Sequence, residues 1–102
     1  MINNPKQPAV VLDIDETVLD NAPYQGWCIE NDSTFSKSSW DRWVRKVQAG
    51  ALTGAKEFTQ YAKENGVEVI YISNRNISQL EATLKNLQEK GFPNARNKFV
   101  FL

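Results

Sequence analysis

The sequence predicts an α/β fold built around a parallel sheet. Three short segments rich in apolar and β-branched residues recur along the chain, at 9–14, 67–73 and 98–102. Two segments with the apolar spacing of amphipathic helices, at 54–64 and 78–90, separate them. Strands that alternate with helices in this way pair in parallel through right-handed crossovers. The 102 residues suffice for one compact domain, so we assign 1–102 to a single domain.

The first strand is predicted over 9–14, Ala-Val-Val-Leu-Asp-Ile, which does not alternate between apolar and polar residues. A run of this kind is typical of a strand buried on both faces of a parallel sheet. Residues 17–53, which follow it, are rich in Asn, Pro, Gly and Ser and predict a long insertion after this strand. Segments of this length between regular elements usually carry function.

One helix is predicted inside the insertion, over 39–48. Four apolar residues share one helical face, Trp40, Trp43, Val44 and Val47. Ser38 and Asp41 have the spacing of a capping box, and Gly50 would end the helix. The two tryptophans have two interpretations: they pack the insertion onto the rest of the domain, which their helical spacing favours, or they form an aromatic wall over a site.

The next helix and strand continue the alternation. Thr53 would cap a helix over 54–64, and the dipeptide Asn65-Gly66 would end it. The β-branched segment 67–73 is predicted as the second strand. The helix then forms the crossover between the first two strands.

A third helix is predicted from the capping-box pattern of Ser78 and Glu81 to Gly91. The last strand, 98–102, is not followed by the helix and strand that normally cover a parallel sheet. The predicted fold is therefore a truncated, Rossmann-like parallel sheet with a helical insertion after its first strand. We expect its uncovered face to associate with another copy of the chain or with another subunit.

Charge and composition exclude several classes of function. Twelve Lys and Arg balance twelve Asp and Glu without a run of like charge, so no nucleic acid polymer is expected as a partner. The sequence has no His, which excludes imidazole zinc sites and Ser-His-Asp triads. A lone cysteine, Cys28, cannot form an intramolecular disulfide and is interpreted as a small buried hydrophobe. Residues 1–8 lack the apolar core of an export signal, and no apolar run is long enough to span a membrane.

Two acids follow the first strand, at the edge of the sheet where open α/β folds bind ligands. Asp13 and Asp15 lie two residues apart, so one carboxylate can attack or hold a cation while the other moves a proton. Such a pair suffices for phosphoryl transfer with a hard cation such as Mg²⁺. The alternatives are solvated acids or a calcium-binding loop. The second is disfavoured because Thr17 and Val18 stand where that loop needs an acid or Asn and then a Gly.

The second predicted strand ends in a polar tripeptide, Ser73-Asn74-Arg75. If the two strands are neighbours, its hydroxyl and amide emerge beside Asp13 and can hold phosphate oxygens, and Arg75 can compensate phosphate charge. The alternative is that these residues cap the helix that follows. The pairing with Asp13 favours phosphate binding.

Residues 11–21, Val-Leu-Asp-Ile-Asp-Glu-Thr-Val-Leu-Asp-Asn, resemble the first motif of the haloacid-dehalogenase superfamily. The form DxDETxLDN, followed by Pro23-Tyr24, is similar to that of bacterial class C acid phosphatases, the outer-membrane lipoprotein 5′-nucleotidase family. Later segments are similar in order as well: Trp40-x-x-Trp43-Val44, Gly54-Ala55-x-x-Phe58 and Tyr71-Ile72-Ser73-Asn74-Arg75. The resemblance covers the chain from about Ala9 onward and implies a partial haloacid-dehalogenase-like domain.

This resemblance implies a role for each residue of the site. Asp13 would be the nucleophile that becomes an aspartyl-phosphate, and Asp15 would be the general acid and base. Both would bind Mg²⁺, Asp15 through a main-chain oxygen. Ser73 and Asn74 would bind the transferred phosphoryl group, and Thr17 would orient the loop. A location in the periplasm or at the outer membrane is implied as well.

Two aromatic residues of the insertion suggest which phosphomonoester is bound. Tyr24 and Trp27 offer ring faces near the acids, and stacking of a base on such a ring is worth about 1–3 kcal/mol. We therefore expect a nucleoside monophosphate as the substrate.

The resemblance also implies residues that this sequence does not include. Family members carry a Lys in a third motif and the acids of a G-D-N-x-x-D segment in a fourth, and Lys98 precedes the third strand and is not equated with that Lys. We interpret the sequence as the N-terminal portion of a Mg²⁺-dependent acid phosphatase. Two alternatives stay open: transfer of the phosphoryl group to a hydroxyl acceptor instead of water, and an incomplete fragment that acts only as a structural or associating module.

Overall fold

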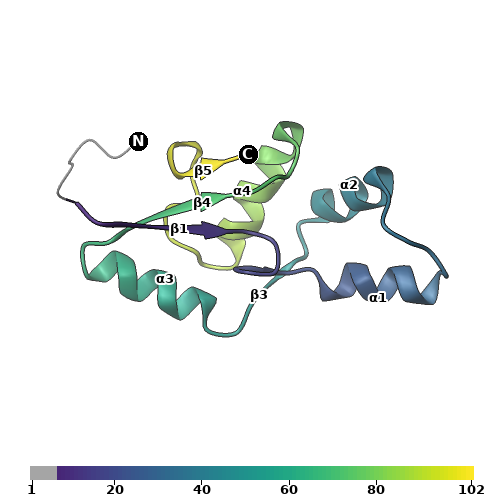
Figure 1. The fold of residues 1–102 in the computed structure, drawn as a ribbon, viewed down its shortest axis with the longest axis horizontal. Coiled ribbons are helices and arrows are strands. Elements are labelled where there is room, and N and C mark those ends of the chain that lie inside the picture. The colour runs from purple at the N-terminus through teal and green to yellow at the C-terminus, as the bar shows by residue number, and fades with distance from the viewer. Residues whose placement is uncertain (1–6) are drawn as a thin grey trace.

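The computed structural model describes residues 7–102 as a mixed α/β structure (Figure 1). Its main sheet has three parallel strands in the order β1-β4-β5. They are β1 (Ala9–Asp13), β4 (Glu68–Ile72) and β5 (Val100–Phe101), the last of which follows a short 3₁₀ helix, η2 (Asn97–Phe99). The predicted α/β class and the parallel sheet are confirmed. Residues 1–6, where the sequence predicts no export signal, lie outside the described part of the chain.

Two helices connect the strands of this sheet. Helix α3 (Ala55–Glu64) precedes β4, and α4 (Leu80–Glu89) lies between β4 and β5, as the sequence predicted. One buried core joins the strands to both helices and includes Val69, Tyr71, Val100, Ala62 and Leu87. Removal of this apolar area from water, worth roughly 25 cal/mol per Å², holds the helices against the sheet. Within residues 7–102, no helix is both long and apolar enough to cross a membrane.

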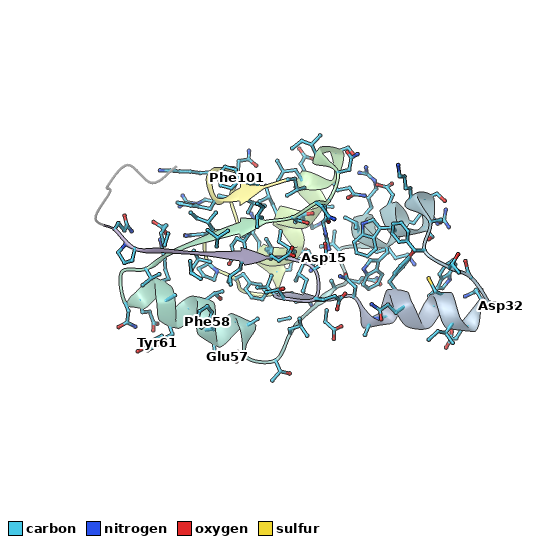
Figure 2. All side chains as sticks on the ribbon, viewed as in Figure 1. Asp15, Asp32, Glu57, Phe58, Tyr61 and Phe101 are labelled. Atoms are coloured by element: carbon cyan, nitrogen blue, oxygen red, sulfur yellow. The ribbon has the colours of Figure 1, made fainter. Side chains whose placement is uncertain are left out.

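The opposite face of the sheet is uncovered in the part of the chain that the structure describes. Val11, Ile72 and Phe101 alternate with the core positions and are 59%, 51% and 44% exposed. Figure 2 shows Phe101 on β5 and Asp15 beyond the end of β1. The prediction that the first strand is buried on both faces is therefore wrong, because residues 7–102 supply helices for one face only.

The insertion forms a helical unit at one end of the molecule (Figure 1). A short antiparallel ribbon, β2 (Leu19–Asp20) with β3 (Gly50–Ala51), leads into and out of it. Between these strands lie α1 (Ala22–Glu30) and α2 (Lys37–Lys46). The helix predicted at 39–48 corresponds to α2, whereas α1 was not predicted.

Helix α1 could not be predicted from the sequence because it has no stripe of apolar residues along one face. Tyr24 is the residue of this helix that is buried, and Pro23 and Gly26 are both typical of loops. Pro23 lies in the first turn, where its missing N–H leaves no helical hydrogen bond unmade. A segment that was expected to be irregular is therefore helical.

The caps of α2 and α3 differ from the predicted ones by one or two residues. Ser36, rather than Ser38, caps α2 by accepting a hydrogen bond from the Ser39 amide at 3.1 Å. Several serines in a row offer similar caps, and their spacing alone does not separate them. Gly54, rather than Thr53, precedes α3 with a φ of 85°, a conformation that glycine adopts without strain.

The entry to α4 is also shifted. A single 3₁₀ turn, η1 (Ile77–Gln79), precedes the helix. Its capping box pairs Asn76 with Gln79, not Ser78 with Glu81 as the sequence predicted. Both pairs have the same spacing, so the choice depends on where the chain leaves β4.

The first residue of β4 makes an acid-sensitive contact. Glu68 accepts hydrogen bonds from Lys63 Nζ at 2.6 Å and Asn94 Nδ2 at 2.5 Å. The Lys63 contact above all, then Asn94, holds the pKa of Glu68 below its usual value of 4.5. Because the pKa is lowered in the folded state, the stabilisation is present above about pH 4.5 and is lost as the pH falls through the folded-state pKa.

We therefore expect Glu68→Gln to lower the urea midpoint of unfolding at neutral pH and to make it fall less steeply below about pH 4.5. Since the Lys63 side chain is 44% exposed, the effect is at most about 1 kcal/mol. Glu64→Gln, at an exposed position of α3, is the control. A parent-like pH dependence in Glu68→Gln would contradict this role.

Candidate active site

The turn after β1 places Asp15 at the carboxyl end of the sheet. The carbonyl of Ile14, a fully buried residue, accepts hydrogen bonds from the amides of residues 17–19 at 2.9–3.3 Å. Glu16 has a φ of 63°, in the left-handed region that favours glycine. Strained backbone of this kind persists where the surrounding contacts hold it, and it is concentrated at functional sites.

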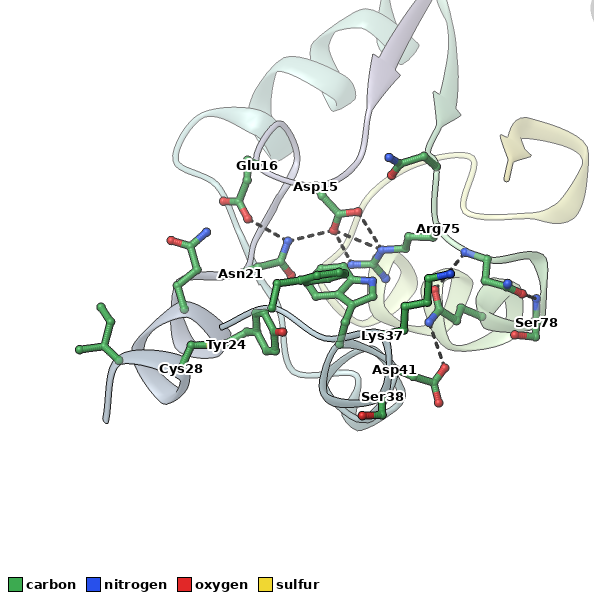
Figure 3. Close-up of a pocket in the computed structure, with 17 residues that line it drawn as sticks. Asp15, Glu16, Asn21, Tyr24, Cys28, Lys37, Ser38, Asp41, Arg75 and Ser78 are labelled. Atoms are coloured by element: carbon green, nitrogen blue, oxygen red, sulfur yellow. Dashed lines mark hydrogen bonds and ion pairs between the residues drawn. The ribbon is translucent and has the colours of Figure 1, made fainter. Parts of the chain in front are cut away.

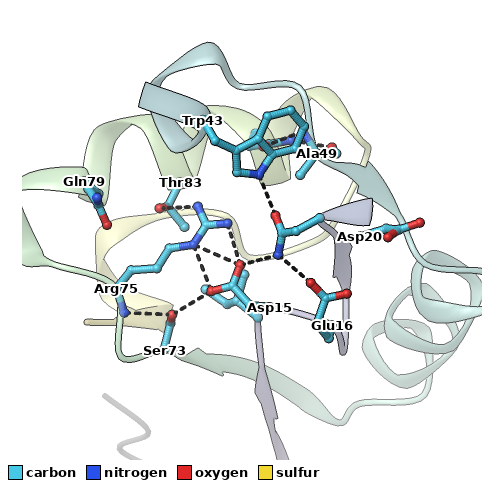
Figure 4. Close-up of polar contacts among 12 residues, drawn as sticks. Asp15, Glu16, Asp20, Trp43, Ala49, Ser73, Arg75, Gln79 and Thr83 are labelled. Carbon is cyan, nitrogen blue, oxygen red and sulfur yellow. Dashed lines mark hydrogen bonds and ion pairs between the residues drawn. The ribbon is translucent and has the colours of Figure 1, made fainter. Parts of the chain in front are cut away.

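The Asp15 carboxylate is held by donors from three directions (Figure 4). Arg75 binds it through two nitrogens, Nη2 to Oδ1 at 2.6 Å and Nε to Oδ2 at 3.0 Å. Asn21 Nδ2 donates to Oδ1 at 2.9 Å, and Ser73 Oγ lies 3.5 Å from Oδ2. A planar guanidinium that binds both oxygens fixes the orientation of a carboxylate as well as its charge.

Arg75 is itself fixed from the other side. Its side chain is 1% exposed, and Nη1 donates to Thr83 Oγ1 of α4 at 3.0 Å. The guanidinium also lies over the ring of Trp40, 5.4 Å from the ring centroid. Its amide donates to Ser73 Oγ at 3.1 Å. Buried charges of this kind require a partner, and Asp15 is that partner.

Asn21 is fully buried between the acids and the insertion. Its Nδ2 donates to Asp15 and, at 2.9 Å, to Glu16 Oε1. Its Oδ1 accepts a hydrogen bond from Trp43 Nε1 at 2.8 Å. Each polar atom of the amide thus has a partner, as burial requires.

A cavity of about 1020 Å³ opens beside Asp15, between the turn after β1, the two helices of the insertion and the segment after β4 (Figure 3). Asn74 and Arg75 line it together with Asp15. Aromatic rings of the insertion line it as well, those of Tyr24, Phe35 and Trp40. The cavity is large enough for a small organic ligand, and its lining is both apolar and polar.

Asp13 and Ser73 differ in their placement from the other predicted site residues. Asp13 is the exposed last residue of β1, opposite Ile72, and it is not among the residues that line the cavity. Its Oδ1 accepts a hydrogen bond from the amide of Ile14 at 2.8 Å, and the carboxylate is otherwise accessible. Ser73, which is 8% exposed, uses its hydroxyl to contact Asp15 and Arg75.

The two predicted stacking residues are placed differently from each other. Tyr24 lines the main cavity, is 7% exposed and has its hydroxyl 2.8 Å from Ser39 Oγ. Its ring packs edge-on against Trp40, with the centroids 5.3 Å apart. Trp27 is 40% exposed and lines a separate cavity of about 310 Å³. The structure therefore does not bring Trp27 to the cavity that holds Asp15.

Other residues of the site were not assigned by sequence reasoning. Phe35 and Lys37 line the cavity although neither lies in a motif. For Trp40 the sequence favoured packing over a place in an aromatic wall, and the residue both packs on Tyr24 and borders the cavity. Cys28 is half-buried and lines the cavity, so it is less buried than predicted. The only sequence signal for Phe35 is the number of aromatic residues in the insertion.

A second polar cluster ties the insertion to the segment after β4. Asp41 of α2 accepts hydrogen bonds from Arg45 Nε at 2.8 Å and from Gln79 Nε2 at 2.9 Å. These contacts, that of Arg45 first, hold the pKa of Asp41 below its ordinary value. Gln79 is 4% exposed, so the contact fixes α2 at the wall of the cavity.

The residues present fit a divalent cation only in part. No group of three or more His, Cys, Asp and Glu is placed to hold a metal ion between residues 7 and 102. The carboxylate of Asp15 is bound to Arg75, which leaves that of Asp13 available. Mg²⁺ prefers six oxygen ligands, many of which are water in most sites. This chain therefore offers the beginning of a magnesium site.

Two solved structures of one protein match almost the whole chain. The class C acid phosphatase from Bacillus anthracis is 43% identical, with a TM-score of 0.92 over 98% of this chain and 42% of that chain. The same enzyme with tungstate bound is also 43% identical, with a TM-score of 0.91. The matched 98% of the chain includes both the insertion and the sheet.

Curated plant proteins are more distant relatives. The stem 31 kDa glycoprotein of Glycine max is 31% identical over 85 residues, and acid phosphatase 1 of Solanum lycopersicum is 29% identical over 82 residues. Each match covers 80% of this chain, and the chain spans about a third of the length of these relatives, 32% in both cases.

A family model confirms the resemblance that the sequence motifs indicated. It matches residues 1–101 and describes subfamily IIIB of the haloacid-dehalogenase superfamily. The match includes the turn with Asp13 and Asp15, the insertion, and the segment with Arg75. The chain therefore belongs to the haloacid-dehalogenase superfamily, in the acid phosphatase subfamily IIIB.

Proposed function

We propose that this chain carries the nucleophile and the acid-base residue of an acid phosphatase that hydrolyses phosphomonoesters. The observation that supports this most is the Asp15 carboxylate, which is held by Arg75 and Asn21 at the carboxyl end of β1 and borders a cavity. Membership of the acid phosphatase subfamily gives the reaction class. The Bacillus anthracis relative binds tungstate, a tetrahedral oxyanion like phosphate.

In the proposed reaction, an Asp13 oxygen attacks phosphorus and the bond to the ester oxygen breaks. The departing oxygen takes a proton from Asp15, which must be protonated at this step, so its ion pair with Arg75 would have to loosen when the phosphomonoester, which also attracts the guanidinium, binds. This step leaves an aspartyl-phosphate on Asp13. Water then gives a proton to Asp15 and attacks phosphorus, which releases inorganic phosphate and restores both carboxyl groups. Asp13 suits the first role because its carboxylate is exposed, and Asp15 suits the second because its orientation is fixed.

Ser73 and Asn74 would bind the phosphoryl oxygens. Asn74 is exposed and borders the cavity, so its amide is available to an incoming phosphate. Ser73 Oγ contacts Asp15 at a long 3.5 Å, a bond that a phosphate oxygen could replace. The guanidinium of Arg75 is bound to Asp15 and Thr83, and its contribution to phosphate binding would be through its charge.

Magnesium would be held by the Asp13 carboxylate and the main-chain oxygen of Asp15, with water and residues outside this chain as the other ligands. When bound, the cation would screen the charge of Asp13 from that of the phosphate. This part of the proposal rests on the chemistry of the donor set and on the family resemblance.

The proposed substrates are nucleoside monophosphates. Tyr24 and Trp40 form an aromatic wall at the cavity, and Phe35, which is 63% exposed, has its ring centroid 6.3 Å from that of Trp40. Stacking of a base on such rings is worth about 1–3 kcal/mol. Trp27 would contribute only if the insertion presented its separate cavity to the same ligand.

The experiment that tests this function supplies the part of the relative that these residues do not match. Residues 1–102 are fused to the remainder of the Bacillus anthracis enzyme, of which they replace the matched 42%. We expect this fusion protein to hydrolyse a chromogenic phosphomonoester with Mg²⁺ and to be inhibited by tungstate. Product analysis with an added alcohol separates hydrolysis from transfer to a hydroxyl acceptor. A correctly folded fusion protein without turnover would contradict the proposal.

Substrate preference gives a separate prediction. The fusion protein should hydrolyse nucleoside monophosphates with a kcat/KM about five- to 150-fold above that for simple alkyl phosphates, since stacking contributes about 1–3 kcal/mol. Phe35→Ala should reduce this ratio. Phe58→Ala, on the exposed side of α3 (Figure 2), is the matched control and should leave it unchanged. Equal kcat/KM values for the two substrate types would remove the stacking argument.

A second candidate function is supported by the uncovered sheet face. Val11, Ile72 and Phe101 together expose an apolar surface that parallel sheets normally cover. The chain would then act as an associating module. Its association is open to direct measurement in solution.

A further inference from the structure

Helix α2 of the insertion sends two tryptophans toward the same carboxylate. Trp40 and Trp43 lie three residues apart, on one face of the helix. Trp43 contacts Asn21 and Trp40 contacts Arg75, and these two residues bind the same oxygen of Asp15. Neither interpretation drawn from the sequence, packing of the insertion or an aromatic wall over the site, accounts for these contacts.

Trp43 sets the orientation of the Asn21 amide. Its Nε1 can only donate, so the atom of Asn21 that faces it must be Oδ1. The amide nitrogen is thereby turned toward the carboxylates of Asp15 and Glu16, each at 2.9 Å. With the opposite orientation, Oδ1 would face two carboxylates and repel them. The indole N–H therefore selects the orientation that binds Asp15.

Trp40 acts on the other partner. Its ring lies against the Arg75 guanidinium, while Thr83 takes the Nη1 end of that group. The remaining nitrogens, Nε and Nη2, point to Asp15 as a fork. An arginine stacked on a ring and bonded at one end has little freedom to rotate.

Helix α2 is in turn attached to the rest of the domain. Gln79 binds Asp41 at 2.9 Å, and Val44 is buried in the core. Arg45 Nη2 lies 3.5 Å from the carbonyl of Ser78. The position of the insertion is therefore linked to the position of the two tryptophans.

We infer that Trp43 and Trp40 are positioning residues, which orient the Asp15 carboxylate through Asn21 and Arg75 when the insertion packs on the domain. The inference deepens the proposed function, on which it rests for the acid-base role of Asp15. It assigns to the insertion a part in assembling the site besides lining the cavity.

The first test uses the 102-residue chain and does not depend on activity. The three indole N–H signals of Trp27, Trp40 and Trp43 are assigned by NMR, and their exchange with deuterium is measured. We expect the Trp43 signal to exchange at least tenfold more slowly than that of the 40% exposed Trp27. The variant Asn21→Leu leaves the Trp43 ring in place and removes the oxygen that accepts its hydrogen bond. In this variant the slow exchange of the Trp43 signal should disappear. Equal exchange for Trp27 and Trp43 in the parent would overturn the inference.

The second test measures the consequence for Asp15. Trp43→Phe keeps an aromatic ring and removes the donor, and in the fusion protein it should lower kcat about tenfold or more with little change in KM. Trp40→Leu should also lower kcat, through Arg75, and should raise KM as well because Trp40 lines the cavity. Tyr61→Phe, at an exposed position of α3, is the control. An unchanged kcat in a folded Trp43→Phe variant would overturn the inference.

The two tests separate the inference from the function on which it rests. A fusion protein without activity contradicts the proposed function, while the exchange measurement still decides whether Trp43 holds Asn21. If Trp43→Phe does not fold, Asn21→Leu replaces it in the kinetic comparison, because it removes the same link from the other side. Trp43 protection together with a parent-like kcat in Asn21→Leu would limit Trp43 to a structural role.

Discussion

Asp13→Asn should abolish phosphomonoester turnover by the fusion protein, with a loss of more than about 10³-fold in kcat. The amide cannot attack phosphorus as a carboxylate does, and the covalent route through this residue is then closed. Stability should change little. Asp13 is exposed, and the one side-chain hydrogen bond found for it is accepted from the Ile14 amide, which an asparagine oxygen can also accept.

The control for this variant is Asp20→Asn. Asp20 makes the same type of contact, since its Oδ1 accepts a hydrogen bond from the amide of Ala22 at 2.9 Å, but it lies on β2 and does not line the cavity. We expect parent-like kcat and a parent-like urea midpoint in Asp20→Asn. Turnover near the parent level in Asp13→Asn would show that another group attacks phosphorus and would leave Asp13 as a cation ligand at most.

The strands could be predicted from sequence because their apolar composition is a local property. The segments 9–14 and 67–73 contain β1 and β4, and the alternation with α3 and α4 gave the parallel pairing. The apolar run at 9–14 does not indicate whether each face of the strand is buried or exposed. Val11 is exposed because burial depends on which elements are present to cover a strand.

The sequence was sufficient to locate the two acids of the site, but not to identify the residues that contact them. The sequence placed Asp13 and Asp15 at the end of a strand, and the structure agrees. It did not predict that Arg75 and Asn21 would bind Asp15, because these contacts join residues 60 and 6 positions away. The chain between Asp15 and Asn21 also contains Glu16, whose positive φ no local sequence pattern predicts.

The helices of the insertion could be predicted from the sequence only in part. Helix α2 was predicted because the apolar residues of its segment share one helical face, whereas α1 has no such periodic pattern and buries Tyr24 alone. Which aromatic residues meet the cavity depends on how these helices pack. Tyr24 lines it and Trp27, three residues later in the same helix, faces another cavity. The spacing of Tyr24 and Trp27 in the sequence does not indicate which of the two rings lines the cavity beside Asp15.

The 102-residue chain tested alone should be a very poor phosphatase. Of its two proposed catalytic carboxylates Arg75 neutralises one, Glu16 adds a further negative charge at the cavity, and a phosphomonoester brings about two more. Within residues 7–102, no three His, Cys, Asp or Glu side chains are placed together so that they could hold a metal ion. Loss of one preorganised charge partner typically lowers the rate about 10²–10³-fold. We therefore expect kcat at least that far below the value for the fusion protein, together with weak Mg²⁺ binding by calorimetry.

The 102-residue chain should also self-associate. In a solution that contains this chain alone, its uncovered sheet face can be buried only against another copy. Light scattering should give a mass above 11.6 kDa that rises with concentration. Val11→Lys and Ile72→Lys place charge on the uncovered face and should shift the mass toward the monomer. Ile77→Lys adds the same charge at an exposed position of η1, outside the sheet, and serves as the control. A monodisperse monomer that turns over at about 1–10³ per second would contradict both expectations, since it would have a complete site and a stable uncovered sheet.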